Sequence, residues 1–72
     1  MAIDLAKIER WFSYHPPRTD QVERYEAIRA AGKQFALVIL DQTPSCADQS
    51  AAIRHIRNAV STANAAIACG GI

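Results

Sequence analysis

Three prolines divide this chain of 72 residues into three segments, and they constrain its fold more than any other feature. Proline has no backbone amide to donate, and it pushes the residue before it into an extended conformation. The adjacent Pro16 and Pro17 must therefore end any helix that precedes them, and Pro44 must separate the two halves of the remaining chain. The spacing of apolar residues then decides what each segment forms.

Apolar residues in the first two segments recur at intervals of three and four, the spacing of one helix face. They predict a short helix over about residues 3–12 and a long helix that begins at Thr19 or Asp20 and ends before Pro44. Asp20, with Glu23 three residues later, predicts a capping box. Gly32 is costly in mid-helix, by roughly 1 kcal/mol, which suggests close approach of a neighbouring helix or a ligand. The predicted apolar faces are Leu5, Ile8 and Phe12, then Val22, Tyr25, Ile28, Gly32, Phe35 and Ile39.

The third segment predicts a helix with Ser45 as its N-cap and Asp48 in its first turn, where a negative charge favours the helix dipole. Gly70 and Gly71 are expected to end this helix. It carries two apolar stripes, which are Ile53, Ile56, Val60, Ala63 and Ile67, and Ala52, Ala59 and Ala66. A helix with two such stripes must be covered on more than one side, and so short a chain is near the lower limit for a single core. We therefore predict an all-α domain of residues 1–72, with one short N-terminal helix and two long antiparallel helices, assembled into a compact homo-oligomer.

Composition excludes several classes of function. A net charge of +1 argues against binding DNA or RNA polymers, although a small anion remains possible. No apolar run is long enough to span a membrane, and the first residues do not resemble a signal peptide, so we expect a cytoplasmic protein. The two cysteines and two histidines match no zinc pattern, and no cofactor is predicted. No nucleophile with a base, glycine-rich phosphate loop or paired carboxylates is recognisable, so we expect no catalytic residue and no enzyme.

Two features could bind a small anion. Tyr14, His15 and Pro16 lie in a rigid loop whose aromatic ring could stack on a nucleobase. Alternatively Tyr14 fills the core between helices, and His15 makes a structural hydrogen bond. Arg29 and Lys33 lie one helical turn apart and could contact phosphates, although such residues often form a solvated face.

Three further expectations concern single polar residues. If Arg29 belongs to a solvated face, we expect it to pair with Glu26. Asn64, among small residues, could bond across a helix interface or cap a carbonyl near a ligand. His55 is expected to face solvent.

Several short patterns occur in a fixed order: Y-H-P-P at 14–17, R-Y-x-x-I-R at 24–29 and A-N-A-A-I-A at 63–68. In this respect the chain resembles the phage anti-CBASS cyclic-oligonucleotide sponges. The resemblance implies a compact homohexamer in the host bacterial cytoplasm that sequesters cyclic dinucleotides such as 3′,3′-cyclic GMP–AMP between protomers without cleaving them. Some members also hold cyclic trinucleotides at a separate site.

The resemblance also implies a ligand site. Tyr14 would stack on a base, with His15 and Pro16 in the same loop, while Arg29 from a neighbouring protomer contacts the ligand and Lys33 assists. The chain departs from the family pattern at Ser61-Thr62, where Met-Trp is frequent. It departs again at Cys69-Gly70-Gly71, where a basic residue is frequent, so a trinucleotide site that relies on a C-terminal arginine would lack that residue.

A different class of function is also compatible with the pattern. The apolar stripes could make the chain a phage interaction module that regulates a host protein. That alternative predicts a monomer or dimer with exposed apolar surface and no affinity for nucleotides.

Overall fold

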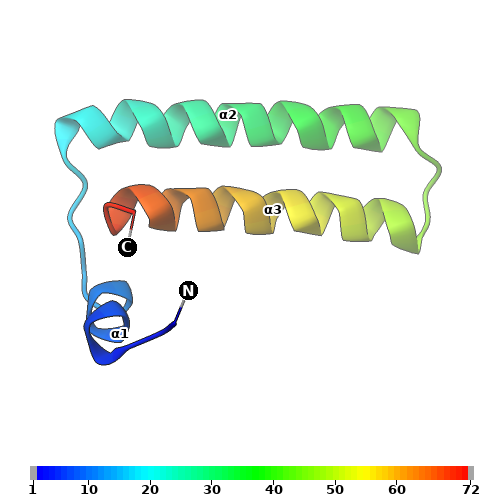
Figure 1. Ribbon diagram of the computed structural model, residues 1–72. Helices are drawn as coiled ribbons and strands as arrows, with labels where there is room; N and C mark the ends of the chain where they lie inside the picture. Colours follow the sequence, from blue (N-terminus) through cyan, green and yellow to red (C-terminus); the bar gives the residue numbers. More distant parts are fainter. Residues whose placement is uncertain (1, 72) are drawn as a thin grey trace.

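The computed structural model describes residues 2–71, which form three helices: α1 (Leu5–Trp11), α2 (Thr19–Gln42) and α3 (Ala47–Ala68). The two long helices run antiparallel side by side, and α1 lies beside the end of the hairpin at which the chain finishes (Figure 1). The predicted all-helical architecture, one short helix followed by two long antiparallel ones, is confirmed. The ends of the predicted domain, Met1 and Ile72, lie outside the described residues.

The short helix is trimmed at both ends relative to the prediction. The side chain of Asp4 accepts a hydrogen bond from the backbone amide of Lys7 at 2.9 Å, so Asp4 caps α1 and the helix begins at Leu5. At the other end, the amide of Phe12 still bonds to the carbonyl of Ile8 at 3.1 Å, but Phe12 has left the helical conformation.

The predicted cap of α2 is wrong. The helix begins at Thr19, and Arg18, in an extended conformation, is its N-cap residue. The side chain of Gln21, three residues after Arg18, accepts a hydrogen bond from the Arg18 amide at 3.0 Å. This is the backbone half of a capping box shifted two residues from the predicted one. Asp20 lies inside the first turn, where its charge favours the helix dipole.

The predicted cap of α3 is wrong by one residue. Cys46, not Ser45, is the N-cap, because its carbonyl accepts the first helical hydrogen bond, from the amide of Ser50 at 3.2 Å. Gln49 strengthens this junction, since its side-chain nitrogen donates to the carbonyls of Leu40 at 3.3 Å and Thr43 at 3.0 Å. The turn at Pro44 is thereby tied to the ends of both long helices.

The predicted end of α3 is confirmed. Gly70 and Gly71 have φ values of 66° and 83°, which L side chains rarely adopt. The amide of Gly71 bonds to the carbonyl of Ala66 at 2.9 Å and that of Gly70 to the carbonyl of Ile67 at 3.2 Å. This pairing is a Schellman motif, which satisfies carbonyls at the end of the helix.

Gly32 is present because α3 approaches α2 closely. A Cβ atom built at Gly32 would lie 2.6 Å from Cγ2 of Val60. Of the two explanations offered by the sequence, the neighbouring helix is therefore correct. The apolar stripe of α3 is partly buried along its length, but the prediction for α2 is wrong at Val22 and Phe35, whose exposed fractions are 41% and 58%. Phe35 lines a hollow together with residues of both long helices.

The chain has almost no core of its own. Among the described residues, only Cys69 and Gln21 are buried, with exposed fractions of 6% and 7%. The radius of gyration is 15.2 Å, whereas a compact domain of this length has a value of about 11 Å. No helix in residues 2–71 combines the length and apolarity needed to cross a bilayer. The single chain is an extended hairpin with a loosely attached short helix.

Candidate functional site

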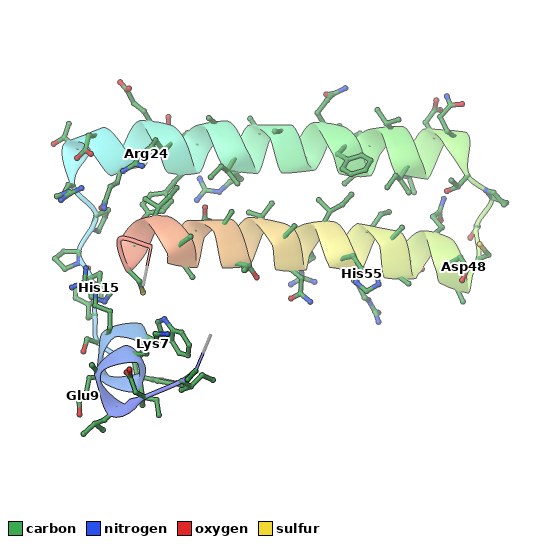
Figure 2. The ribbon with its side chains drawn as sticks, viewed as in Figure 1. Lys7, Glu9, His15, Arg24, Asp48 and His55 are labelled. Atoms are coloured by element: carbon green, nitrogen blue, oxygen red, sulfur yellow. The ribbon has the colours of Figure 1, made fainter. Side chains whose placement is uncertain are left out.

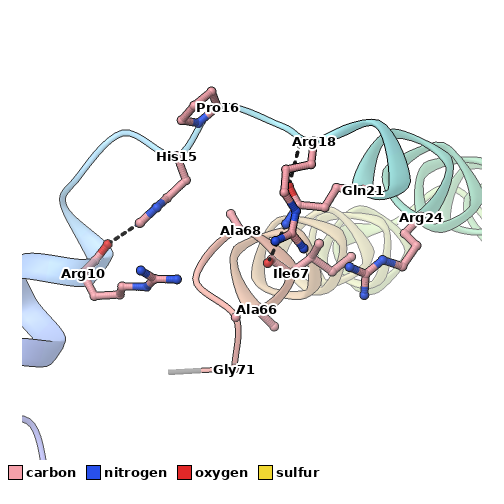
Figure 3. A pocket seen from close by; sticks show the side chains of 11 residues that line it. Arg10, His15, Pro16, Arg18, Gln21, Arg24, Ala66, Ile67, Ala68 and Gly71 are labelled. Atoms are coloured by element: carbon pink, nitrogen blue, oxygen red, sulfur yellow. Dashed lines mark hydrogen bonds between the residues drawn. The ribbon is translucent and has the colours of Figure 1, made fainter.

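A cationic pocket lies where the loop before α2 meets the end of α3 (Figure 3). Its volume is about 540 Å³, and its arginines come from α1, from the loop and from α2. We call it the arginine pocket. It is lined by Arg10, His15, Pro16, Arg18, Gln21, Arg24, Ala66, Ile67, Ala68, Gly70 and Gly71.

Gln21 holds the two sides of the arginine pocket together. Besides accepting from the Arg18 amide, its side chain donates to the carbonyl of Ile67 at 3.4 Å, so it links the start of α2 to the end of α3. Its exposed fraction of 7% makes it the buried polar residue of the described chain. Buried polar groups are usually hydrogen-bonded, and Gln21 satisfies this rule at both ends of its amide. The sequence pattern by itself assigns Gln21 to no site.

Arg10 and His15 fix α1 beside the pocket. The imidazole of His15 donates from Nε2 to the carbonyl of Arg10 at 2.7 Å, which is the structural hydrogen bond that the sequence suggested (Figure 3). The Nε atom of Arg10 donates to the carbonyl of Cys69 at 3.1 Å, one residue beyond α3. α3 has no basic residue in its own last turn, so Arg10 places a cation where the helix dipole favours it.

Arg18 and Arg24 share one carboxylate. The Nε atom of Arg18 lies 3.4 Å from one oxygen of Asp20, and a terminal nitrogen of Arg24 lies 3.7 Å from the other. All three side chains are more than half exposed, so these ion pairs contribute little stability. Asp20 does not line the arginine pocket, and none of the lining residues is acidic. Three guanidinium groups and one neighbouring carboxylate leave the pocket with an excess of positive charge.

The structure brings together only part of the predicted ligand site. His15 and Pro16 line the arginine pocket, but Tyr14, Arg29 and Lys33 do not. Tyr14 has an exposed fraction of 84%, so the alternative that it fills the core between helices is wrong. In a single chain, the predicted aromatic and basic residues therefore do not form one pocket.

Other sequence expectations have mixed outcomes. Arg29 and Lys33 are exposed on α2, and no ion pair joins Arg29 to Glu26 within residues 2–71. The oxygen of the Asn64 side chain is buried and has no hydrogen-bond partner there, so in this chain it makes no bond across the helix interface. His55 is exposed as expected and projects away from α2 (Figure 2).

Metal-binding side chains do not gather in the described chain. No three histidine, cysteine, aspartate or glutamate residues within 2–71 lie close enough to hold an ion. Cys46 is exposed at the start of α3, and Cys69 is buried beside Arg10.

A second hollow has the opposite character. It runs along one side of the hairpin, has a volume of about 620 Å³ and is almost entirely apolar. We call it the apolar groove. It is lined by Ile28, Ala31, Gly32, Phe35, Ile39, Ala52, His55, Ile56, Ala59, Val60 and Ala63, none of which lines the arginine pocket.

Comparison with known proteins identifies one family. The family model described as "Acb2/Tad1, hairpin domain" matches residues 4–68, from the capping residue of α1 to the last residue of α3. No curated protein matches the chain, and no solved structure does.

Proposed function

Because the chain belongs to the Acb2/Tad1 hairpin domain family, the anti-CBASS sponge family, we propose that it sequesters cyclic dinucleotides such as 3′,3′-cyclic GMP–AMP. The observation that carries this proposal is the match of the family model to all three helices. The chain acts by mass action: a tight site present in excess lowers the free concentration of the messenger. We place this activity in a phage-infected bacterium, in the host cytoplasm, where it blocks CBASS immunity.

The exposed side chains of the predicted site suit this role. Tyr14 presents its ring at the end of a loop stiffened by two prolines, and stacking on a base contributes about 1–3 kcal/mol. Arg29 and Lys33 lie one turn apart on α2 and are both exposed, so they are accessible to the phosphates of a ligand. Since the ring and these cations do not meet in one chain, the proposed site combines Tyr14, His15 and Pro16 of one protomer with Arg29 and Lys33 of another.

Self-assembly is part of the proposal. The apolar groove and the large exposed side chains of α1 and α2 give the chain an apolar surface whose exposure to water is unfavourable. A homohexamer covers this surface and closes ligand sites between protomers. The bound ligand is not cleaved, because the proposed contacts hold and neutralise it without a nucleophile. Cyclic trinucleotides are a second class of ligand to be tested.

Isothermal titration calorimetry with 3′,3′-cyclic GMP–AMP tests the proposal, followed by chromatography of the ligand released on denaturation. We expect tight binding and recovery of intact ligand. Tyr14→Ala should weaken binding by more than about tenfold, which corresponds to about 1.4 kcal/mol and lies within the range for stacking. Tyr14→Phe, which keeps the ring, is the matched control and should bind nearly as tightly as the parent.

The contrary outcomes are distinct. Unchanged affinity in Tyr14→Ala would exclude the stacking role of this residue. No binding to cyclic dinucleotides or trinucleotides, together with a monomer or dimer in light scattering, would favour the interaction module. Recovery of hydrolysed ligand would show that the chain is an enzyme after all.

A further inference from the structure

We infer that the arginine pocket is a phosphate-binding site in its own right, complete within one chain, for ligands that carry at least two phosphate groups. Its cations are Arg10, Arg18 and Arg24, none of which belongs to the site proposed above, although His15 and Pro16 line this pocket and are part of that site as well. The inference depends neither on Tyr14 nor on a neighbouring protomer.

The positive charge of the pocket is available to a ligand. Arg18 and Arg24 are held only by long contacts, of 3.4 and 3.7 Å, to the exposed carboxylate of Asp20. Exposed pairs of this kind are weak and exchange readily with other partners. Arg10 uses Nε for the Cys69 carbonyl, and this bond leaves its two terminal nitrogens for other acceptors.

The arrangement selects phosphate over a simple monoanion. A guanidinium group matches two phosphate oxygens at once, and it remains charged at every physiological pH. The three groups approach from the end of α1, from the loop and from the second turn of α2, with the last turn of α3 between them (Figure 3). Cations that surround one space from several sides can each contact a different phosphate, so a ligand with two or more phosphates uses the site fully.

The space beside the arginines fits a nucleotide-sized ligand. A volume of about 540 Å³ lies in the range of about 300–1,000 Å³ typical of small-molecule sites. Gly70 contributes to this room. A Cβ atom at that position would lie 3.4 Å from a terminal nitrogen of Arg10, so a side chain there would crowd the guanidinium group.

The simplest structural explanation, that the arginines only cap α3, accounts for Arg10 alone. The carbonyls of Ala65, Ala66 and Ile67 already accept backbone amides from the residues after the helix. Gln21 also bonds to Ile67, and Arg10 bonds to Cys69. Within residues 2–71, Arg18 and Arg24 donate to no carbonyl of α3. Their convergence on the pocket therefore has no role in the hairpin that other groups do not already fill.

The three glycines of the chain provide a direct test by 15N NMR on the full protein. Gly70 and Gly71 line the arginine pocket, whereas Gly32 lies between the helices and serves as an internal reference. We expect inorganic pyrophosphate to shift the amide signals of Gly70 and Gly71 in a saturable manner and to leave Gly32 unchanged. Parallel titrations with adenosine 5′-diphosphate and 3′,3′-cyclic GMP–AMP show whether adjacent or separated phosphates, and hence linear or cyclic nucleotides, occupy the pocket.

Paired charge-removing variants make the test specific. Arg18→Gln/Arg24→Gln should weaken pyrophosphate binding by about tenfold or more, the effect of losing about 1.4 kcal/mol. Arg54→Gln/Arg57→Gln removes the same charge from a separate hollow on α3 and should change affinity by less than about twofold, because distant exposed charges are screened. Circular dichroism confirms that both variants stay helical. In Tyr14→Ala the pyrophosphate response should persist, so the pocket and the proposed stacking site are tested separately.

Three results would overturn the inference. One is the absence of any shift at Gly70 and Gly71 with all three ligands. Another is an equal shift at Gly32, which would indicate a general rearrangement of the hairpin. The third is an equal loss of affinity in the two double variants, which would show that net charge alone attracts the anion.

Discussion

Gly32 sets the distance between α2 and α3, and its replacement by alanine tests the packing of the hairpin. The new Cβ atom would lie 2.6 Å from Cγ2 of Val60 and 3.6 Å from Cγ2 of Ile56. Carbon atoms pack best at about 3.5–4.0 Å, so the contact with Ile56 is acceptable and the contact with Val60 is not. Val60 cannot easily turn away, because a valine in a helix has one strongly preferred rotamer. The helices must therefore separate locally.

Two opposing terms decide the magnitude. Alanine has a higher helix propensity than glycine, which favours the variant by about 1 kcal/mol. Overpacking a close contact costs about 1–3 kcal/mol. We expect the packing term to dominate, so that Gly32→Ala lowers the free energy of unfolding by a net value of about 1 kcal/mol. A loss of this size lowers the Tm by roughly 4–8 °C for a domain of this size.

Thermal unfolding followed by circular dichroism, at one fixed protein concentration, measures the effect. Ala30→Gly, at an exposed position of α2, gives the propensity term in the same helix. Val60→Ala removes the obstructing methyl groups, so the double variant with Gly32→Ala should be more stable than the sum of the two single changes predicts, by about 1 kcal/mol or more. A higher Tm for Gly32→Ala, or strict additivity in this cycle, would refute the close packing described here.

Two further substitutions test the end of α3 and its link to the start of α2. Gln21→Leu leaves the Arg18 amide and the Ile67 carbonyl without this partner and should lower the free energy of unfolding in urea by about 1–3 kcal/mol. The control Gln34→Leu, at an exposed position of α2, should change that free energy by less than about 0.5 kcal/mol. Equal effects would show that Gln21 does not link the helices. Gly70→Ala forces a residue with a side chain to adopt a φ of 66° and should cost roughly 1–2 kcal/mol of stability. Gly70→Asn should cost less, because asparagine tolerates this backbone region. A Gly70→Ala chain as stable as the parent would contradict the Schellman motif.

The sequence specifies the helices more completely than their ends. Prolines and apolar spacing are local signals, and they correctly predict three helices, the turn at Pro44 and the glycine stop after Ala68. The predicted N-caps of α2 and α3 are wrong. Asp20 and Ser45 are expected there because their residue types favour the N-cap position, and this preference takes no account of tertiary contacts. At α2, the preference is overridden by Gln21, which reaches the Arg18 amide and the end of α3 at the same time. That second contact exists only after the hairpin has formed.

The site is less predictable for the same reason. The local pattern predicts His15 and Pro16 as site residues, and both line the arginine pocket. Arg10, Arg18 and Arg24 lie in three different segments, and only the antiparallel pairing of α2 with α3 and the bond from Arg10 to Cys69 bring them together. The nearest local signal is the absence of a basic residue in the last turn of α3, where the helix dipole favours a cation from another segment.

The distribution of apolar surface along α2 bears on how many copies assemble. Within the second half of α2, Phe35, Leu37, Val38 and Leu40 are all about half exposed or more. At 100° per residue, these side chains point in four different directions around the helix, and α3 covers only one side. A helix that is apolar all round is normally buried on every side, so we expect more than one neighbouring chain to cover this half of α2. This supports an assembly larger than a dimer, and a monomer or dimer in light scattering would contradict it. The arginine pocket lies at the other end of α2 and shares no residue with the apolar groove, so burial of the groove can leave the pocket open to ligands.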